Sequence, residues 1–311
     1  DFEVLGTFSG AELEYMKTAH PFLDRTSLVI VGDHVTLESG TGCVHTAPGH
    51  GVEDYDVCRN YPELPIVVPV DSHGKMTAEA GEQFAGLTTE EANKAIAKQL
   101  EATGNLFALE KIIHQYPHCW RCKNPVLFRA TEQWFCSVDD FKEDAVKAIQ
   151  KVQWIPGWGE DRITSMVRDR KDWCISRQRK WGVPIPIFFC KECGEPLIDR
   201  DAMLAVAELF RKEGSNSWYQ KDASEILPAG TVCKKCGGKE FDKEKDIMDV
   251  WFDSGSTHAA VLAERPYLKW PADLYLEGAD QYRGWFQSSL LTSVATRGEA
   301  PYKAVVTHGW V

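Results

Sequence analysis

The sequence lacks a run of about 20 apolar residues, the length with which a helix crosses a bilayer, and it has no signal peptide at its start. It also lacks an excess of basic residues, because 35 Lys and Arg stand against 46 Asp and Glu, a net charge of −11. We therefore expect a cytoplasmic protein without a membrane segment. A nucleic acid would have to bind a local basic patch, since the overall charge repels it.

No initiator Met opens the chain, which starts at Asp1 and stops at Val311, shortly after the apolar run 304–306. Both ends suggest an internal piece of a longer sequence. The length of 311 residues predicts two or three domains. A hydrophobic share of 43%, with 11% aromatics, is ample for packed cores and argues against disorder.

The first third of the chain predicts a mixed, strand-rich domain. Apolar residues between Gly and Asp turns indicate strands over 27–31, 34–37 and 66–68. A helix is predicted over 88–103, where Thr88 and Glu91 make a capping box.

The remainder predicts an α/β fold with a parallel sheet. Further helices are expected over about 140–152, from a cap at Asp201 to Gly214, and around 286–294 before Gly298. Strands are expected at 275–276 and 304–306, on either side of the last helix. Strand, helix and strand in this order form a βαβ unit.

Six of the ten cysteines form three CxxC pairs. Two of these pairs, Cys190/Cys193 and Cys233/Cys236, are each followed by Gly. Two such turns can direct four thiolates at one ion, so we predict a closed, structural Zn²⁺ site. Buried free thiols and a redox dithiol are the alternatives.

The third pair, Cys119/Cys122, is left over, because four ligands need only two pairs. Either it binds nothing, or its partner pair lies outside this sequence, which is the interpretation that we favour. The isolated Cys43, Cys58, Cys136 and Cys174 are expected to be core thiols.

Residues 41–56 concentrate two His and three carboxylates among Gly and Pro, which is typical of a tight loop at a pocket. His45 and Asp54 could bind an ammonium group and select side chains by size. Alternatively, His45, His50 and Asp54 could ligate a metal, or the segment could be a rigid surface loop. The residues alone leave all three open.

The segment 172–186 combines aromatic and cationic side chains, as in a nucleic-acid stacking strip or a buried hinge. A basic patch is expected at Arg168, Arg170, Lys171, Arg177, Arg179 and Lys180. Residues 277–286 follow a predicted parallel strand, where open α/β sheets bind nucleotides. There Gly278 permits close backbone approach, and Asp280 can accept from ribose hydroxyls or cap a helix.

These segments together resemble class I aminoacyl-tRNA synthetases, specifically the isoleucyl family. The resembling strings are GTGCVHTAPGHGVEDYD at 40–56, WCISRQRKWGVPIP at 173–186, DVWFDSG at 249–255, EGADQYRGWF at 277–286 and THGW at 307–310. The resemblance implies ligation of isoleucine to tRNA(Ile) with ATP and Mg²⁺, and hydrolytic editing of misacylated valine. It also implies a cytoplasmic monomer, while relatives differ in whether they carry cysteines at the 190–236 knuckles.

The resemblance also implies roles for single residues. In editing, Asp54 would anchor the α-amino group of valine, His45 would help to exclude isoleucine, and a positioned water would hydrolyse the ester without a metal. In synthesis, the implied amino-acid and adenylate contacts are Trp251, Glu277, Gly278, Asp280, Gln281, Trp285, His308 and Gly309. Among these, Trp251, Gln281 and Trp285 would face the isoleucine.

By this resemblance, residues 1–115 are part of an editing domain and 116–186 lead back to the catalytic core. Residues 187–247 form a zinc ribbon, and 248–311 form the second half of a Rossmann-type domain. The family's Thr-rich, HIGH and KMSKS segments are not in the sequence, so we expect little deacylation and no adenylate formation by this chain alone. The alternatives are a free-standing editing hydrolase and a non-enzymatic zinc-ribbon protein that binds nucleic acid.

Overall fold

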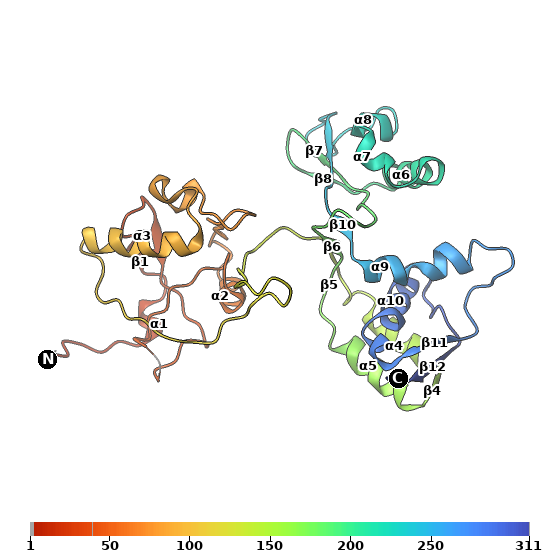
Figure 1. The fold of residues 1–311 in the computed structure, drawn as a ribbon, viewed down its shortest axis with the longest axis horizontal. Helices are drawn as coiled ribbons and strands as arrows, with labels where there is room; N and C mark the ends of the chain where they lie inside the picture. The colour runs from red at the N-terminus through yellow and green to blue at the C-terminus, as the bar shows by residue number, and fades with distance from the viewer. Residues whose placement is uncertain (1–2, 39, 311) are drawn as a thin grey trace. The chain divides into compact units, whose positions relative to one another are not determined.

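The computed structural model describes residues 3–38 and 40–310, and the chain divides into two compact units, residues 1–132 and 133–311 (Figure 1). Residues 116–132 belong to the first unit, and the predicted zinc ribbon, residues 187–247, lies in the second. The finer division into four parts remains a prediction. Among the described helices, none combines the length and the apolar character that crossing a membrane requires.

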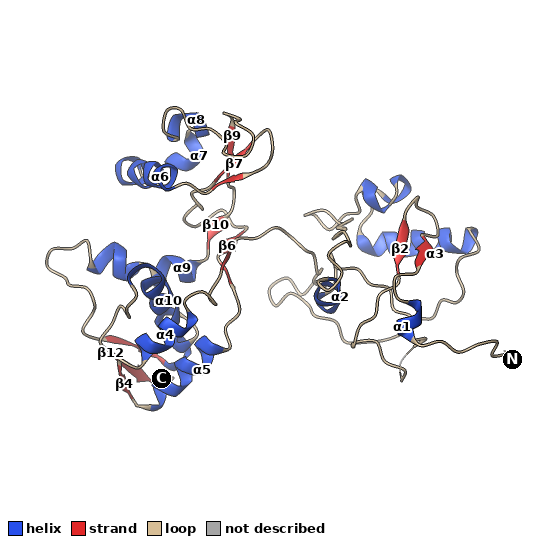
Figure 2. Cartoon of the chain, turned by 180° about the vertical axis from the view of Figure 1, so that it is seen from behind, coloured by secondary structure: helices blue, strands red, loops and turns tan. Residues whose placement is uncertain are grey.

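The first unit contains little regular structure, and most of it is loop (Figure 2). Its elements are α1 (Gly10–Leu13), β1 (Lys17–Ala19), β2 (Thr26–Leu28), α2 (Val52–Cys58), η1 (Ala78–Ala80), η2 (Glu82–Phe84) and α3 (Thr89–Ala102). Strands β1 and β2 pair antiparallel. The predicted capping box of α3 is confirmed, since Glu91 N donates to Thr88 Oγ1 and Thr88 N donates to Glu91.

The prediction of strands over 34–37 and 66–68 is wrong, because neither segment forms one. Leu37 is 95% exposed and Ile66 is 50% exposed. Apolar alternation produces a strand only where a neighbouring strand supplies hydrogen bonds and packing partners. In the part of the chain that the structure describes, no strand pairs with residues 34–37 or 66–68.

The second unit is built on a parallel sheet of β4 (Gln153–Ile155), β11 (Tyr275–Gly278) and β12 (Ala304–His308), in the order β11-β12-β4. Helix α10 (Trp285–Arg297) joins β11 to β12 and ends at Gly298, whose φ of 75° favours glycine. The predicted βαβ unit is confirmed. The chain therefore has an α/β fold with mixed sheets.

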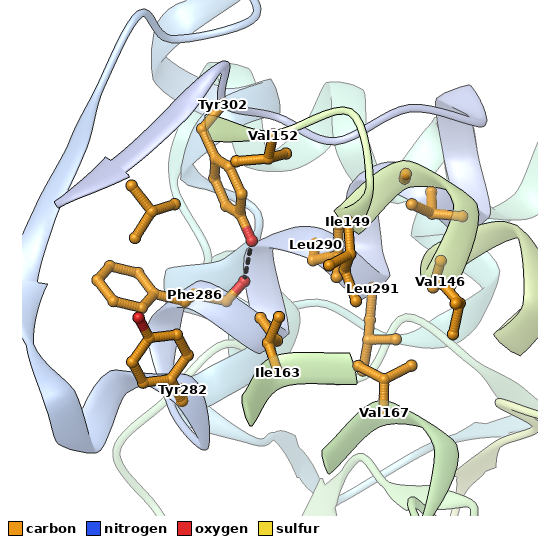
Figure 3. Packing of buried hydrophobic residues seen from close by; sticks show 14 of the residues in the cluster. Val146, Ile149, Val152, Ile163, Val167, Tyr282, Phe286, Leu290, Leu291 and Tyr302 are labelled. Carbon is orange, nitrogen blue, oxygen red and sulfur yellow. Dashed lines mark hydrogen bonds between the residues drawn. The ribbon is translucent and has the colours of Figure 1, made fainter. Parts of the chain in front are cut away.

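The main core lies where α10 meets α4 (Lys142–Ile149) and α5 (Trp158–Arg168) beside this sheet (Figure 3). Ile149, Ile163 and Leu290 are completely buried. The phenol of Tyr302 donates to the carbonyl of Phe286 at 2.9 Å and satisfies the polar end of a buried ring.

Two short antiparallel pairs bring the 172–177 segment beside the 247–250 segment. Strand β3 (Phe135–Cys136) pairs with β5 (Trp173–Cys174), and β6 (Ser176–Arg177) pairs with β10 (Ile247–Met248). Helix α9 (Val250–Gly255) and the π-helical turn η3 (His258–Leu262) follow. This arrangement places α9 against α10.

A second core belongs to the segment between β6 and β10. Strands β7 (Phe188–Cys190), β8 (Pro196–Leu197) and β9 (Phe241–Lys243) form an antiparallel sheet in the order β8-β7-β9. It packs with α6 (Arg200–Glu213), α7 (Ser217–Gln220) and α8 (Ala223–Ile226). The predicted cap at Asp201 is wrong. Asp199 caps α6 by accepting from the amides of Asp201 and Ala202, because Asp201 already lies in the first turn.

Candidate functional site

Four of the predicted adenylate residues meet at the carboxyl ends of β11 and β12. These strands are parallel, and their register places Glu277 opposite Thr307 and Gly278 opposite His308. The Glu277 Oε1 and His308 Nε2 atoms are 3.7 Å apart, with both side chains half exposed, and Gly309 follows directly. This is the sheet edge at which α/β folds bind ligands.

The turn η4 (Ala279–Tyr282) leads from β11 to α10 and positions two more predicted residues. Gln281 Oε1 accepts from the Trp285 amide at 2.8 Å, and Gln281 Nε2 donates to Asp280 Oδ2 at 3.1 Å. Gln281 therefore fixes the start of α10, a role that the sequence did not suggest. Asp280 is exposed and does not cap α10.

The two predicted pocket tryptophans are held by different means. Trp285 stacks on Tyr275 with a centroid distance of 4.0 Å, and its Nε1 donates to the Ser254 carbonyl at 3.0 Å. Trp251, on α9, is 42% exposed. A Cβ on Gly284 would lie 2.9 Å from the Trp251 ring and 2.5 Å from Gln281 Oε1, so glycine is what allows this close approach.

A cavity of about 410 Å³ lies beside Trp251, and its lining includes Arg170, Lys171 and Arg177 of the basic patch expected from the sequence. Its floor contains Asp249, which is 4% exposed. Asp249 Oδ2 accepts from Trp173 Nε1 at 2.9 Å and lies 3.3 Å from Arg177 Nη2, while Oδ1 accepts from the Trp251 amide. Asp249 thus positions the α9 tryptophan.

The four predicted metal-ligating cysteines do come together. The Sγ atoms of Cys190, Cys193, Cys233 and Cys236 all lie within 4.8 Å of one another. The Cys190–Cys236 and Cys193–Cys233 Sγ distances are 3.5 and 3.6 Å. Four sulfurs about 2.3 Å from a tetrahedral ion would be about 3.8 Å apart, so the cluster fits a bound metal ion.

Backbone amides favour the thiolate form at one of the four cysteines, Cys233, whereas the pKa of Cys236 is raised to about 12, with its thiol hydrogen-bonded to those of Cys193 and Cys190. Hydrogen bonds from the amides of Cys236 and Lys235 lower the pKa of the Cys233 thiol to about 7. The thiolate is the form that binds metal.

The third CxxC pair has the same backbone geometry as the Cys190 knuckle. The Cys119 amide donates to the Asn124 carbonyl, and the Lys123 amide donates to the Cys119 carbonyl, each at 2.8 Å. The Cys190 knuckle has the same pair of hydrogen bonds, to Glu195 and from Gly194. Lys123 adopts the left-handed φ of 63° that Gly194 adopts at 71°. Within residues 3–38 and 40–310, no further ligands join the Cys119 pair.

The 41–56 segment places Asp54 in the first turn of α2. Its Oδ2 accepts from the Ala47 amide at 3.0 Å. A Cβ on Gly51 would lie 2.6 Å from this oxygen, so the fold-back requires glycine. His45 is exposed and precedes this turn. The pKa of His20 is lowered by burial, by the charge of Arg25 and, to a smaller extent, by His45.

The metal-site alternative for this loop lacks the geometry. Among the residues that the structure describes, the only group of three or more convergent ligands is the four-cysteine cluster, so His45, His50 and Asp54 do not gather. His50 Nδ1 instead lies 2.9 Å from the Phe128 carbonyl.

The isolated cysteines differ in burial. Cys58 is buried, as predicted, and burial raises the pKa of its thiol. Cys136 and Cys174 are partly buried, whereas Cys43 is exposed, so the prediction of a core thiol is wrong for Cys43. It lies in an open turn, where its amide and carbonyl are hydrogen-bonded to Thr41 Oγ1.

Comparison with known proteins extends across both units. The family model of class I tRNA synthetases (I, L, M and V) matches residues 3–311. An isoleucine–tRNA ligase of Caldicellulosiruptor saccharolyticus is 64% identical over 310 residues, which are 100% of this chain and 34% of that protein. One from Moorella thermoacetica is 62% identical over 311 residues, 100% of this chain and 33% of that protein.

The chain thus spans about a third of the length of the curated relatives that it matches. Among solved structures, a ternary complex of Agrobacterium radiobacter K84 agnB2 LeuRS, tRNA and LeuAMS is 20% identical and covers 45% of this chain and 19% of that one. Its TM-score of 0.30 is too low to bear on the fold.

Proposed function

Because the chain belongs to the class I tRNA synthetases of the I, L, M and V group, we propose that its second unit forms part of the site in which an isoleucine–tRNA ligase activates isoleucine with ATP and transfers it to tRNA(Ile). The observation that carries this proposal is the register of β11 and β12. It places Gly278 opposite His308 at one sheet edge, at the start of α10.

The residues at this edge have complementary tasks. Trp251 and Trp285 provide apolar faces for a branched aliphatic side chain, and the Glu277 carboxylate can accept from the ammonium group. Gly278 has no side chain to obstruct a nucleotide, while its amide donates to Glu277 Oε1 at 2.9 Å; the exposed Asp280 can accept from ribose hydroxyls. We assign His308 and Gly309, at the end of β12 on the same edge, to the adenine. ATP with Mg²⁺ supplies the phosphoanhydride that activates the amino acid.

We propose that the first unit contributes the amino-acid pocket of an editing site for misacylated valine. Asp54 uses one carboxylate oxygen to hold the Ala47 amide, which leaves the other for an ammonium group. His45 limits the room for the side chain, and a water attacks the ester. The fixed, glycine-dependent position of Asp54 supports this role.

We propose that the four-cysteine cluster holds a structural Zn²⁺. Sulfur would take all four positions of a tetrahedral ion, so no position would remain for a substrate. Zinc would hold the sheet of β7, β8 and β9 together, because the cysteines come from both ends of the ribbon sequence.

The synthetic site is tested by calorimetric titration with a non-hydrolysable isoleucyl-adenylate analogue. We expect saturable binding that Trp251→Ala weakens by about tenfold or more, since it removes a large apolar contact. Trp181→Ala is the matched control, because Trp181 is 95% exposed and lies outside the site. Equal losses in the two variants would contradict the proposal.

The editing site is tested with non-hydrolysable analogues of valyl-adenosine and isoleucyl-adenosine, in which an amide replaces the ester. Asp54→Asn should weaken valyl binding, because a charged ammonium loses its carboxylate partner. Asp56→Asn, on the same helix and exposed, is the control. Valyl binding that survives Asp54→Asn unchanged would rule out the assigned role.

A further inference from the structure

Strand β9 forms one edge of the β8-β7-β9 sheet in the predicted ribbon (Figure 2). Just before this strand, the Lys191 amide donates to the Glu240 carbonyl at 2.9 Å, so even-numbered residues direct their backbone groups at β7. Hydrogen bonding alternates along an antiparallel strand. The amides and carbonyls of Phe241 and Lys243 therefore point away from β7, and no hydrogen bond from the residues that the structure describes reaches them.

A cavity of about 810 Å³ lies along this strand. It is lined by Lys191 and residues 239–243 on the sheet side, and by residues 222–224 and 227–232 of the segment that follows. That segment offers apolar contacts, because it includes Leu227 and Val232, the latter 44% exposed. The volume is typical of a ligand pocket. None of the residues assigned above to synthesis, editing or metal binding lines this cavity.

The exposed face of the strand is acidic at alternate positions. The side chains of Glu240 and Asp242 are 76% and 72% exposed, and residues two apart lie on one face of a strand. Lys191 Nζ lies 3.8 Å from a carboxylate oxygen of each. A single lysine therefore serves two carboxylates, and both keep room for a second cation.

The other charges at this cavity are engaged or belong to another face. Lys243 Nζ donates to the backbone carbonyls of Trp218 and Lys221. Asp222 belongs to the capping box of α8. Lys239 precedes the strand, and alternation directs its side chain to the face opposite that of the two carboxylates. The charge presented beside the free edge is thus negative.

The same pattern disfavours pairing between two copies of the chain. When two β9 edges pair antiparallel, alternation sets even-numbered residues opposite even-numbered residues. Those residues are Glu240, Asp242, Glu244 and Asp246, so carboxylates would meet in each register. Like charges directly opposite one another destabilise a sheet. The phosphates of a nucleic acid would meet the same carboxylates.

We propose that the β9 edge binds an extended peptide segment of a partner protein, paired antiparallel, with basic side chains opposite Glu240 and Asp242. The peptide backbone exchanges hydrogen bonds with Phe241 and Lys243, as a strand does when it extends a sheet. Its basic side chains pair with the two carboxylates, and the apolar side chains between them pack in the cavity. This role goes beyond the proposed synthetic, editing and metal-binding functions.

The test measures fluorescence anisotropy of a labelled peptide, Thr-Lys-Val-Lys-Val-Lys-Thr, with the full chain and equimolar Zn²⁺. We expect saturable binding. In the proposed register, the valine amides donate to β9 and the lysine amides point away from it. N-methylation of both valines should therefore weaken binding by about tenfold or more, whereas N-methylation of two lysines should change it by less than about twofold.

Charge reversal on the protein tests the assigned side chains. Asp242→Lys should weaken binding of the lysine peptide by about fivefold and should strengthen binding of the same peptide with glutamates in place of the lysines. Asp201→Lys is the matched control, since Asp201 is also exposed, belongs to the same ribbon and lies outside the cavity. This control should leave both affinities unchanged.

Equal affinities of the two N-methylated peptides would overturn the proposal, because binding would then not use the strand edge. Equal effects of Asp242→Lys and Asp201→Lys would remove the assigned charge pairing. If none of the peptides bound, the carboxylates would serve only to protect a bare edge from pairing. Tighter binding of a single-stranded RNA, strengthened by Asp242→Lys, would make the surface a nucleic-acid site instead.

Discussion

The guanidinium of Arg177 lies 3.3 Å from the carboxylate of Asp249, between Nη2 and Oδ2. This contact joins the WCISRQRKWGVPIP segment to the DVWFDSG segment across the β6–β10 pair. Asp249 is 4% exposed, and it also accepts from the Trp173 indole and the Trp251 amide. One side chain therefore links the strand segment to the helix that carries Trp251.

Asp249→Ala should destabilise the second unit by about 2–4 kcal/mol. The change leaves a buried indole donor unsatisfied and removes the cap of α9. Urea unfolding measures the loss. Asp273→Ala provides the comparison, because Asp273 is 62% exposed and its pairs with Lys269 and Lys303 should be worth less than about 1 kcal/mol. Similar losses for the two variants would show that Asp249 has no linking role.

Gly284→Ala should weaken binding of the isoleucyl-adenylate analogue and also lower stability, because Gln281 Oε1, which accepts from the Trp285 amide at the start of α10, must move. The new Cβ would lie 2.5 Å from Gln281 Oε1 and 2.9 Å from the Trp251 ring, so both side chains must move. We expect about a tenfold weaker Kd by titration calorimetry. Gly157→Ala serves as the control, since nothing lies within 4 Å of a Cβ there. Unchanged affinity in Gly284→Ala would mean that the Trp251 position does not matter.

Two groups beside α10 should give opposite pH dependences of stability. Burial, together with Arg297, lowers the pKa of His258 from 6.5 to about 4. As the pH drops from 6.5 to 4, His258 is protonated in the unfolded chain before it is protonated in the folded one, so stability falls. Burial, together with Asp249, raises the pKa of Asp253 from 3.8 to about 6, so its folded carboxyl holds a proton longer and stability falls as the pH rises through this window.

The Asp253→Asn variant should therefore lose stability more steeply than the parent between pH 6.5 and 4. One group contributes at most about 1.4 kcal/mol per pH unit. Denaturant unfolding at several pH values compares the two slopes. Equal slopes would mean that Asp253 does not titrate differently in the folded and unfolded states.

The cysteine geometry predicts one tightly held Zn²⁺ per chain that depends on the ribbon. Cys233→Ser should abolish it and lower the Tm, because zinc binding contributes folding free energy. The double variant Cys119→Ser/Cys122→Ser should keep it, since that pair is separate from the cluster. Elemental analysis after dialysis measures the zinc content of each variant. If the double variant lost its zinc while Cys233→Ser kept it, the assignment of the metal to the four-cysteine cluster would be contradicted.

Local signals in the sequence were sufficient for several elements. The capping box before α3 and the glycines after α6 and α10 involve residues within one helical turn. Helix α5 was missed because it follows Gly157 and shows its buried face mainly through Ile163 and Val167. The strands predicted over 34–37 and 66–68 failed because pairing depends on distant segments.

The sites show the same division between local and distant information. The CxxC knuckles belong to continuous motifs, so the sequence identified them, whereas the close approach of Gly284 to Trp251 became visible only in the fold. The hydrogen bond between Trp173 and Asp249 joins residues that are 76 positions apart, so it became visible only in the fold. Gln281 was assigned to the ligand, but its Oε1 is held by the Trp285 amide.

The most direct test of the proposed synthetic site is a crystal structure of the chain with the isoleucyl-adenylate analogue. We predict density at the carboxyl ends of β11 and β12, with a ribose hydroxyl about 3 Å from the Asp280 carboxylate and the aliphatic side chain against Trp251. Density elsewhere on the unit, or an empty β11–β12 edge at a saturating concentration, would contradict this assignment.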